Sequence, residues 1–234
     1  MLVLFSCGGD EEILAVKNSK CLLTSEKRGS ADITYEYNEL NQLVRVVGNW
    51  ESLNKLTETF LEWDDQGRVV KIYDQENQTE LSYFADSIIV NADLEFSSSG
   101  FFQGKNVYIL DELGRFVELI YNGNTWMQVT YFEDDNIKEI FVRTSNGLVQ
   151  LVEYFEYDTL RSNYSNIPFT FYLEEGNVLG GYSPFNFINN PLRSKVVFRE
   201  EEDLFSYEYN ALGYPVRAGR NTSSFVDTYG YLCN

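Results

Sequence analysis

A single turn sequence recurs along the chain, and it limits the fold more than any other feature does. Its fullest copy spans residues 63–69 and reads WDDQGRV. Trp63 ends one strand, and the side-chain oxygen of Asp64 caps the turn. Gly67 supplies a backbone position with positive φ. A strand that begins at Val69 then returns, so each copy predicts one β-hairpin.

Copies of this turn recur at intervals of about 22–26 residues. Self-similarity at a fixed period indicates a repeat architecture in which each unit is one supersecondary element. The motif uses its residues for turn formation, and none of them needs a ligand. The further copies span residues 37–44, 110–117 and 209–216, with a shorter copy at 132–137 and degenerate copies at 83–89 and 154–158.

Three glycine-containing dipeptides predict further hairpins between these turns. Asn122-Gly123 and Asn146-Gly147 each separate two β-rich runs, and Gly48-Asn49 precedes a run led by Trp50. Asn-Gly between such runs is a strong hairpin signal because a type I′ turn needs positive φ at both central residues.

The composition agrees with an all-β fold. Aromatic residues make up 16% of the 234 residues, and only 4 residues are proline. Aromatic and β-branched residues favour strands, and no long stretch has helical periodicity. The length suits one large β domain. We predict an antiparallel β-meander of repeated hairpins, curled into a barrel-like or strongly twisted sheet.

The pattern at residues 63–69, aromatic-Asp-x-x-Gly-Arg-hydrophobic, resembles the tyrosine-aspartate (YD) repeat of bacterial Rhs-type proteins. Over roughly residues 31–234 the chain is more similar to a family of Bacteroidota surface lipoproteins of unknown function with a porin-like β fold. That family has an aromatic-Tyr-Asp segment, here 155–158, that leads into an Asn- and Pro-containing region, here 163–168. The resemblance implies a fold and a location, and no activity.

The N-terminal residues resemble the end of a bacterial lipoprotein signal. Residues 4–7, Leu-Phe-Ser-Cys, have the order of a lipobox, and residues 8–12 resemble the acidic export tag of surface lipoproteins. The resemblance implies that Cys7 carries a lipid, which anchors the protein to the outer membrane at the cell surface. Only 6 residues precede Cys7, fewer than a complete signal needs. A cytosolic protein with a fortuitous apolar N-terminus is the alternative.

These assignments divide the chain into three parts. Residues 1–6 are the remnant of a signal peptide, residues 7–30 form the lipidated N-terminus and a tether or first edge strand, and residues 31–234 form one YD-repeat-like β domain. Within that domain, residues 159–206 break the rhythm of the turns and hold three of the four prolines. We expect an irregular insertion there.

The insertion is the candidate ligand-binding surface, because irregular segments on a regular scaffold often carry function. Its aromatic side chains would line a groove for a ligand. The alternative is that these rings plug the barrel or cover a sheet edge. The candidate residues are Tyr164, Phe169, Phe171, Tyr172, Tyr182, Phe185 and Phe187.

Charge and composition exclude several functions. The formal net charge of −18 repels phosphate backbones, so no nucleic-acid partner is expected. The chain has no histidine, which excludes Ser-His-Asp and Cys-His nucleophilic systems and histidine zinc ligands. The acidic run at 200–203 lacks the alternating spacing and the glycine of a calcium loop. We predict no metal site, no cofactor and no catalytic residues, although a carboxylate-pair glycosidase is still allowed.

Charged residues also argue against a membrane pore. A membrane barrel needs an uninterrupted apolar outer band. Strict alternation along residues 115–121 places Glu118 on the same face as Phe116 and Ile120. We therefore expect a barrel with a filled interior that is displayed on a tether and is not embedded in the bilayer.

Two cysteines besides Cys7 lie near the two ends of the folded region, Cys21 and Cys233. Outside the cytoplasm they can form a disulfide. Two free thiols are the alternative.

The functional expectation is a non-catalytic binding or scaffold module, with an extracellular glycan as the leading ligand. A structural envelope protein, or one that binds another surface protein, is the alternative. A carboxylate-pair glycosidase ranks below both.

Overall fold

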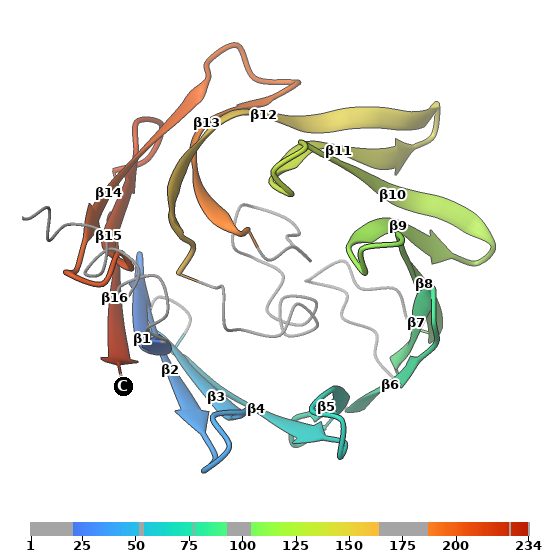
Figure 1. The fold of residues 1–234 in the computed structure, drawn as a ribbon, viewed down its shortest axis with the longest axis horizontal. Coiled ribbons are helices and arrows are strands. Elements are labelled where there is room, and N and C mark those ends of the chain that lie inside the picture. Colours follow the sequence, from blue (N-terminus) through green and yellow to red (C-terminus); the bar gives the residue numbers. More distant parts are fainter. Residues whose placement is uncertain are drawn as a thin grey trace, which may run out of the picture.

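The computed structural model contains sixteen antiparallel strands that form one closed barrel (Figure 1). It describes residues 21–51, 54–76, 78–92, 104–163, 187–224 and 226–233. The predicted all-β antiparallel meander is therefore confirmed, and the sheet closes on itself. The described part of the chain contains no helix long and apolar enough to cross a membrane.

The strands follow one another around the barrel in chain order. They are β1 (Cys21–Arg28), β2 (Ala31–Tyr37), β3 (Leu43–Trp50), β4 (Lys55–Trp63), β5 (Val69–Tyr73), β6 (Gln78–Tyr83), β7 (Ser87–Ala92), β8 (Gly104–Leu110), β9 (Phe116–Tyr121), β10 (Asn124–Tyr131), β11 (Ile137–Thr144), β12 (Gly147–Arg161), β13 (Asn189–Val196), β14 (Asp203–Tyr209), β15 (Pro215–Arg220) and β16 (Val226–Cys233).

Because neighbouring strands are consecutive and antiparallel, their connections alternate between the two ends of the barrel. One end carries the turns from even- to odd-numbered strands, the start of β1 and the end of β16. We call this end the repeat rim, because all copies of the recurring turn lie on it. The opposite rim carries the turns from odd- to even-numbered strands.

The turn between β4 and β5 shows how the motif works. The Asp64 amide donates to the Arg68 carbonyl at 2.9 Å, and Asp64 Oδ1 accepts the amides of Gln66 and Arg68. Gly67 has a φ of 74°, a value that favours glycine. The same hydrogen bonds recur in the turns capped by Asn38, Asp111 and Asn210.

The copy at 132–137 is not shorter than the others. Its aromatic residue is Tyr131, and the Phe132 amide donates to the Asn136 carbonyl at 2.8 Å. Asp135 has a φ of 67° and occupies the position of the glycine. The sequence obscured this copy because a phenylalanine stands where the capping aspartate is expected.

Each clear copy of the turn is followed by a β-bulge. Trp63 pairs with Val69 and Glu62 pairs with Lys71, so Val70 is an extra residue in β5. The bulge shifts the side-chain alternation, and Val69 and Ile72, three residues apart, are both buried. The same register shift follows the turns between β2 and β3, β8 and β9, β10 and β11, and β14 and β15.

The bulge corrects the face assigned to Glu118. Val117 is the extra residue of β9, so Phe116 and Leu119 both face the buried side. Glu118 lies on the opposite face, where its carboxylate accepts a hydrogen bond from the Thr125 hydroxyl. The strict alternation used in the sequence analysis was wrong here because it ignored the bulge.

Aromatic side chains of even-numbered strands donate hydrogen bonds to backbone carbonyls of the preceding strands along the repeat rim. The Trp63 indole at the end of β4 donates to the Leu43 carbonyl at the start of β3, at 2.7 Å. The Tyr131 hydroxyl at the end of β10 donates to the Phe116 carbonyl at the start of β9, at 2.6 Å. Equivalent bonds join Tyr37 to Leu23, Tyr83 to Val69, Tyr157 to Ile137, Tyr207 to Pro191 and Tyr231 to Pro215.

All of these rim aromatics except Tyr207 pack against the buried cluster of the barrel, and burial raises the pKa of the rim tyrosines. Desolvation raises the pKa of Tyr83 to about 12, and it raises the pKa of Tyr131 and Tyr231 further. A hydroxyl that is buried and held as a donor resists ionisation because the phenolate would lose its solvation.

The predicted type I′ hairpin at Asn122-Gly123 is confirmed, with φ values of 49° and 72°. The hairpin at Asn146-Gly147 is present, but Gly147 already belongs to β12 and pairs with Thr144. Of the two, only Gly147 has positive φ, so this turn is not type I′.

The predicted hairpin at Gly48-Asn49 is wrong, because both residues lie inside β3 and the chain turns after Trp50. A Cβ on Gly48 would lie 2.7 Å from Thr57 Oγ1 and 3.0 Å from Trp50 Nε1. The glycine therefore makes room for the Trp50 ring, and it does not form a turn.

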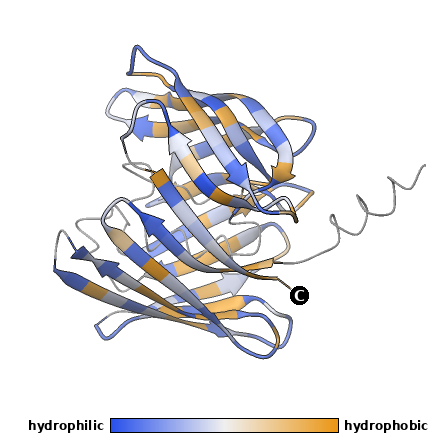
Figure 2. Cartoon of the chain, turned by 90° about the vertical axis from the view of Figure 1, so that its left-hand side faces the viewer, coloured by the Kyte–Doolittle hydropathy of each residue, from blue (hydrophilic) through white to orange (hydrophobic). Residues whose placement is uncertain are grey.

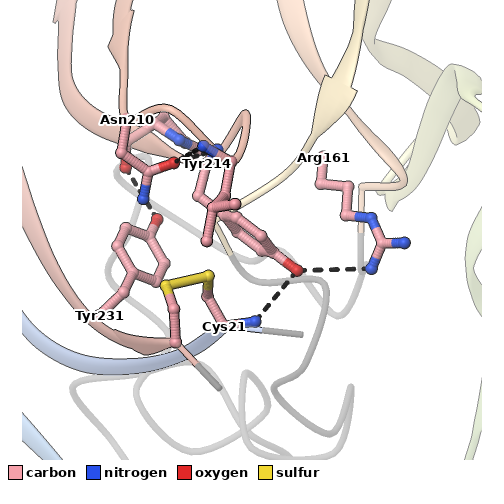
Figure 3. Close-up of a disulfide and its surroundings, with 8 residues drawn as sticks. Cys21, Arg161, Asn210, Tyr214 and Tyr231 are labelled. Atoms are coloured by element: carbon pink, nitrogen blue, oxygen red, sulfur yellow. Dashed lines mark hydrogen bonds between the residues drawn. A yellow bond between two sulfur atoms is a disulfide. The ribbon is translucent and has the colours of Figure 1, made fainter. Parts of the chain in front are cut away.

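The barrel begins earlier than the predicted domain boundary at residue 31. β1 pairs with β16 on one side and with β2 on the other, so residues 21–28 are an integral part of the sheet. Cys21 and Cys233 stand opposite each other at this closing seam and form a disulfide (Figure 3).

The predicted irregular insertion is shorter than residues 159–206. β12 extends to Arg161, and β13 occupies Asn189–Val196 with a regular antiparallel partner in β12. Pro191 is one of the three prolines in the predicted insertion, yet it lies inside β13. It pairs with Tyr157, and the Tyr207 hydroxyl donates to its carbonyl.

Hydrophobic and hydrophilic residues alternate along many strands, as Figure 2 shows. The buried side chains face inward, because a closed sheet shields only its inner face. The outward face carries ion pairs such as Arg45 with Glu36 and Glu58, and Arg193 with Glu156. The charges expected on the outer face are therefore present.

Tyr131→Phe tests whether the hydrogen bonds of the rim aromatics stabilise the barrel. It removes the hydroxyl that donates to the Phe116 carbonyl, and a hydrogen bond of this kind contributes about 1 kcal/mol. We expect the free energy of unfolding in urea to fall by about that amount. Tyr73→Phe is the control, because the Tyr73 hydroxyl makes no hydrogen bond within the described part of the chain. Equal losses in the two variants would contradict the role of the rim hydroxyls.

The double variant Cys21→Ser/Cys233→Ser tests the closing seam. The disulfide joins residues 212 positions apart, and a loop of this length corresponds to about 5 kcal/mol in the chain-entropy model. We expect the free energy of unfolding to fall by about 2–5 kcal/mol. A reducing agent should destabilise the wild type equally and leave the double variant unchanged. A wild type insensitive to reduction would show that the seam does not need the disulfide.

Candidate functional site

Six of the seven predicted ligand-surface residues lie outside the described residues, as does Cys7 with its predicted lipid. The seventh, Phe187, is partly buried and packs against the core. Its ring centroid lies 5.4 Å from that of Tyr154 and 6.3 Å from that of Tyr157. Phe187 therefore belongs to the packing of the core beside β12.

The start of the same segment is fixed by a modified copy of the recurring turn. Asp158 follows the rim aromatic Tyr157, and its Oδ1 accepts the Leu160 amide at 3.0 Å, as a turn cap does. The second amide comes from Asn190, 32 residues away, also at 3.0 Å. Asn190 Nδ2 donates to Asp158 Oδ2 at 2.9 Å, as the Arg68 guanidinium does to Asp64. The chain thus leaves the turn and returns to complete it.

A second pair of asparagines holds the two ends together. Asn136 Nδ2 donates to Asn189 Oδ1 at 3.1 Å, and Asn189 Nδ2 donates to the Leu160 carbonyl at 2.8 Å. The Ser162 amide donates to the Ile188 carbonyl at 3.1 Å. We call Asp158, Asn189, Asn190 and the residues they bond the insertion base.

Tyr209 completes the insertion base from β14. Its hydroxyl donates to Asp158 Oδ2, and desolvation together with this hydrogen bond raises the pKa of Tyr209. Tyr207 instead provides the rim bond to Pro191. The base is therefore tied to three strands, β12, β13 and β14.

The insertion base also touches the closing seam. The Tyr214 hydroxyl accepts the Cys21 amide at 3.2 Å and Arg161 Nη1 at 3.4 Å (Figure 3). The Tyr214 ring lies 5.3 Å from that of Tyr231. The disulfide and the start of the segment thus share one buried tyrosine.

One buried polar group beside the insertion base has no hydrogen-bond partner among the described residues. Asn163 is 9% exposed, and its amide nitrogen Nδ2 makes no hydrogen bond within that part of the chain. Its Oδ1 accepts the Ser162 hydroxyl at 3.3 Å. A buried donor left unpaired costs about 1–3 kcal/mol, so an unpaired one marks a place where a ligand acceptor would be stabilised.

The outward aromatic pair on β4 and β5 is not a free stacking platform. The Phe60 and Tyr73 rings are stacked, with centroids 5.4 Å apart. The guanidinium of Arg45 lies 6.0 Å from the Phe60 centroid, and Lys71 Nζ lies 5.0 Å from that of Tyr73. The cations occupy the ring faces that a sugar would need.

Two residues of the acidic run at 200–203 form ion pairs with arginines. Asp203 is buried and lies 3.7 Å from Arg199 and 3.8 Å from Arg220, and Glu202 lies 3.4 Å from Arg193. Within the described residues, no group of three or more Cys, Asp or Glu side chains is arranged to hold a metal ion. Glu202 and Asp203 therefore form ion pairs at the opposite rim.

Sequence reasoning found Asp158 as part of a degenerate turn but missed its partners. Nothing local predicts that Asn190 completes the turn of Asp158, because the two lie on different strands. The dipeptide Asn190-Pro191 carried a weak signal, since Tyr214-Pro215 occupies the same place after the cap of another turn.

No protein-family model matches this chain, and no curated protein matches it. Chains of solved structures match this chain, among them two of low identity. A porin-like protein from Bacteroides uniformis ATCC 8492 is 14% identical, covers 90% of this chain and 95% of its own, and has a TM-score of 0.38. The TcdB2-TccC3-TEV structure is 11% identical over 82% of this chain and 9% of its own, with a TM-score of 0.30. At these TM-scores neither similarity bears on function.

Asp158→Ala tests the insertion base. It removes the acceptor of Leu160, Asn190 and Tyr209, and we expect the free energy of unfolding to fall by about 2–4 kcal/mol. Hydrogen exchange of the Leu160 and Asn190 amides should accelerate at least tenfold. Asp111→Ala removes the same kind of cap from a turn without an insertion, and should leave those two amides unchanged. Equal exchange in both variants would show that the base opens independently of Asp158.

Proposed function

We propose that this protein is a non-catalytic binding module held at the outer surface of the outer membrane, and that its leading ligand is an extracellular glycan. The unpaired amide of Asn163 carries the proposal. Glycan hydroxyls are acceptors as well as donors, so a sugar would satisfy this buried donor.

The geometry of the insertion base supports a binding role. Both ends of the segment between Asn163 and Phe187 are tied to the barrel by Asp158, Asn189 and Asn190. Fixing both ends reduces the conformational entropy that a binding segment loses when it contacts a ligand. The predicted aromatic residues of this segment remain our proposed ligand surface, with the exception of Phe187.

The proposed location rests on the N-terminal sequence. A lipid on Cys7 would anchor the protein to the membrane without a spanning segment. The disulfide at the barrel seam supports an oxidising compartment, since disulfides rarely persist in the cytosol.

Two other functions compete with this proposal. A structural envelope protein, or one that binds another surface protein, would use the barrel as a scaffold without a glycan site. A glycosidase would need two carboxyl groups about 5–10 Å apart around a substrate. The described carboxylates with resolved partners serve turns and ion pairs, as Asp64, Asp158 and Asp203 do, which favours the binding role.

Thermal unfolding of the full chain with a panel of neutral polysaccharides tests the proposal. A ligand at about 100 times its dissociation constant adds about 2.7 kcal/mol of stability, which raises the midpoint by several degrees. We expect one polysaccharide class to raise the midpoint of the wild type. Asn163→Ala should abolish that shift. It removes the donor Nδ2 together with the oxygen that accepts the Ser162 hydroxyl, so the free protein should lose about 1 kcal/mol of stability at most.

Three outcomes separate the functions. No shift with any polysaccharide would contradict the glycan proposal and favour a protein partner or a structural role. A shift that survives Asn163→Ala would place the glycan elsewhere on the barrel. Release of reducing sugar during the incubation would favour the glycosidase.

A further inference from the structure

The disulfide joins the first residue of β1 to the last residue of β16, at the outermost pair of the seam that closes the barrel. In the ladder of the described strands, this end of β1 pairs with β16 and not with β2. A register shift interrupts the β1–β16 pairing between Leu23 and Ser25, and the β1–β2 pairing begins at Ser25. Residues 21–23 therefore form a short section of the barrel wall that has a ladder partner on one side.

Such a section opens more easily than a strand with two neighbours, because fewer hydrogen bonds break. Two tyrosine hydroxyls and the disulfide add to its attachment. Tyr37 donates to the Leu23 carbonyl at 2.8 Å, and Tyr214 accepts the Cys21 amide at 3.2 Å. The disulfide is the covalent link among these contacts, so its reduction is expected to free residues 21–23 before the rest of the barrel.

The two cysteines differ in exposure. Cys21 is fully buried, whereas Cys233 is partly exposed. Thiol–disulfide exchange begins with attack of a thiolate on one of the two sulfurs, and access selects which one. A dithiol would therefore attack Sγ of Cys233, with the Cys21 thiolate as the leaving group. The second thiol of the reductant then breaks the mixed disulfide. Both cysteines end as thiols after taking up two electrons and two protons, and the dithiol becomes a disulfide.

Three hydrogen bonds connect the seam to the insertion base. The buried Tyr214 hydroxyl accepts the Cys21 amide and also Arg161 Nη1, the latter at 3.4 Å (Figure 3). The Arg161 carbonyl accepts Asn190 Nδ2 at 3.1 Å. Asn190 in turn donates to Asp158, the cap of the interrupted turn. The backbone position of Cys21 thus affects the side chain that holds Arg161.

The strand of the other cysteine also contacts Tyr214. The Tyr231 ring, two residues before Cys233 on β16, lies 5.3 Å from the Tyr214 ring. The Tyr231 hydroxyl donates to the carbonyl of the next residue, Pro215, at 2.8 Å. Both halves of the disulfide are therefore adjacent to the residue that holds Arg161, and movement of either strand end reaches it by direct contact.

From these observations we propose that Cys21–Cys233 is a site of reversible thiol–disulfide exchange, and that its reduction by a dithiol loosens the insertion base. Reduction frees residues 21–23, withdraws the Cys21 amide from Tyr214 and leaves Arg161 less firmly held. The proposed ligand segment then loses its fixed start, so the reduced form binds its ligand more weakly than the oxidised form. This last step rests on the proposed function.

Hydrogen exchange of the full chain with Cys7→Ser, measured with and without dithiothreitol, tests the proposal. The substitution leaves the disulfide pair as the two cysteines of the chain. The Leu160 amide donates to Asp158, and the Ser162 amide donates to the Ile188 carbonyl. We expect reduction to accelerate exchange of both amides by about fivefold, the factor that corresponds to loss of one hydrogen bond.

Amides in an uninterrupted copy of the turn are the internal control. Leu113 and Arg115 donate to the cap Asp111. Their exchange should be the same in both forms, because β8 and β9 lie several strands away from the seam in the barrel. Equal acceleration at both turns would show that reduction loosens the whole barrel, which would overturn the proposal, as would no acceleration at either.

Two matched variants test the route through Tyr214. Tyr214→Phe keeps the ring and removes the hydroxyl, so the Leu160 and Ser162 amides should exchange at the same fast rate in both forms. Tyr37→Phe removes the hydroxyl that donates to the Leu23 carbonyl, in the same section of β1, and should keep the difference between the forms. Thermal unfolding verifies that both variants are folded. A redox effect that persists in Tyr214→Phe would contradict this route.

Mass spectrometry locates the exchange directly. Incubation of the folded chain with reduced glutathione, followed by an acid quench, should place the mixed disulfide on Cys233. A mixed disulfide on Cys21, or a disulfide that dithiothreitol reduces only after unfolding in urea, would overturn the assignment of an exchange site.

These measurements use no glycan, so loss of the polysaccharide shift would leave them unaffected. If a polysaccharide raises the midpoint of thermal unfolding, the shift should be smaller for the reduced chain. Equal shifts in the two forms would show that the disulfide does not regulate the ligand site, while the glycan proposal would stand.

Discussion

The structure depends on one interaction, the hydrogen bond from a rim aromatic to a carbonyl within the first three residues of the neighbouring strand. Seven of the eight even-numbered strands make it, from Tyr37 on β2 to Tyr231 on β16. The turn cap sets where the next strand begins, and the bulge after it directs two side chains inward three residues apart. Together these devices fix the register of each hairpin against the next and allow sixteen strands to close without an edge.

In the insertion base, a residue from a distant part of the chain completes a copy of the recurring turn. Asp158 keeps the role of a turn cap, while Asn190 supplies from a distance the amide that the turn normally finds four residues on. The turn is therefore completed although its two halves lie 32 residues apart in the sequence. The proposed ligand site therefore lies where a modified copy of the recurring turn joins β12 to β13. Beside it, the Asn163 amide nitrogen has no hydrogen-bond partner among the described residues.

The repeat rim brings the closing disulfide and the insertion base together. Tyr214 links them directly, because its hydroxyl accepts both the Cys21 amide and Arg161. The start of the insertion and the seam that closes the barrel are therefore held by one buried side chain. The opposite rim contains Asp203 with its arginines.

Local patterns predicted the hairpins and their repetition, because an Asx cap and a left-handed residue such as Gly67 act within a few positions along the chain. They also predicted Asp158 as a turn residue. Three features became visible only in the folded barrel: the phase of the side chains after each bulge, the role of Gly48 beside Trp50, and the pairing of Asp158 with Asn190. Those features depend on which strands become neighbours. Closure of the whole barrel determines those neighbours, and local sequence patterns do not predict them.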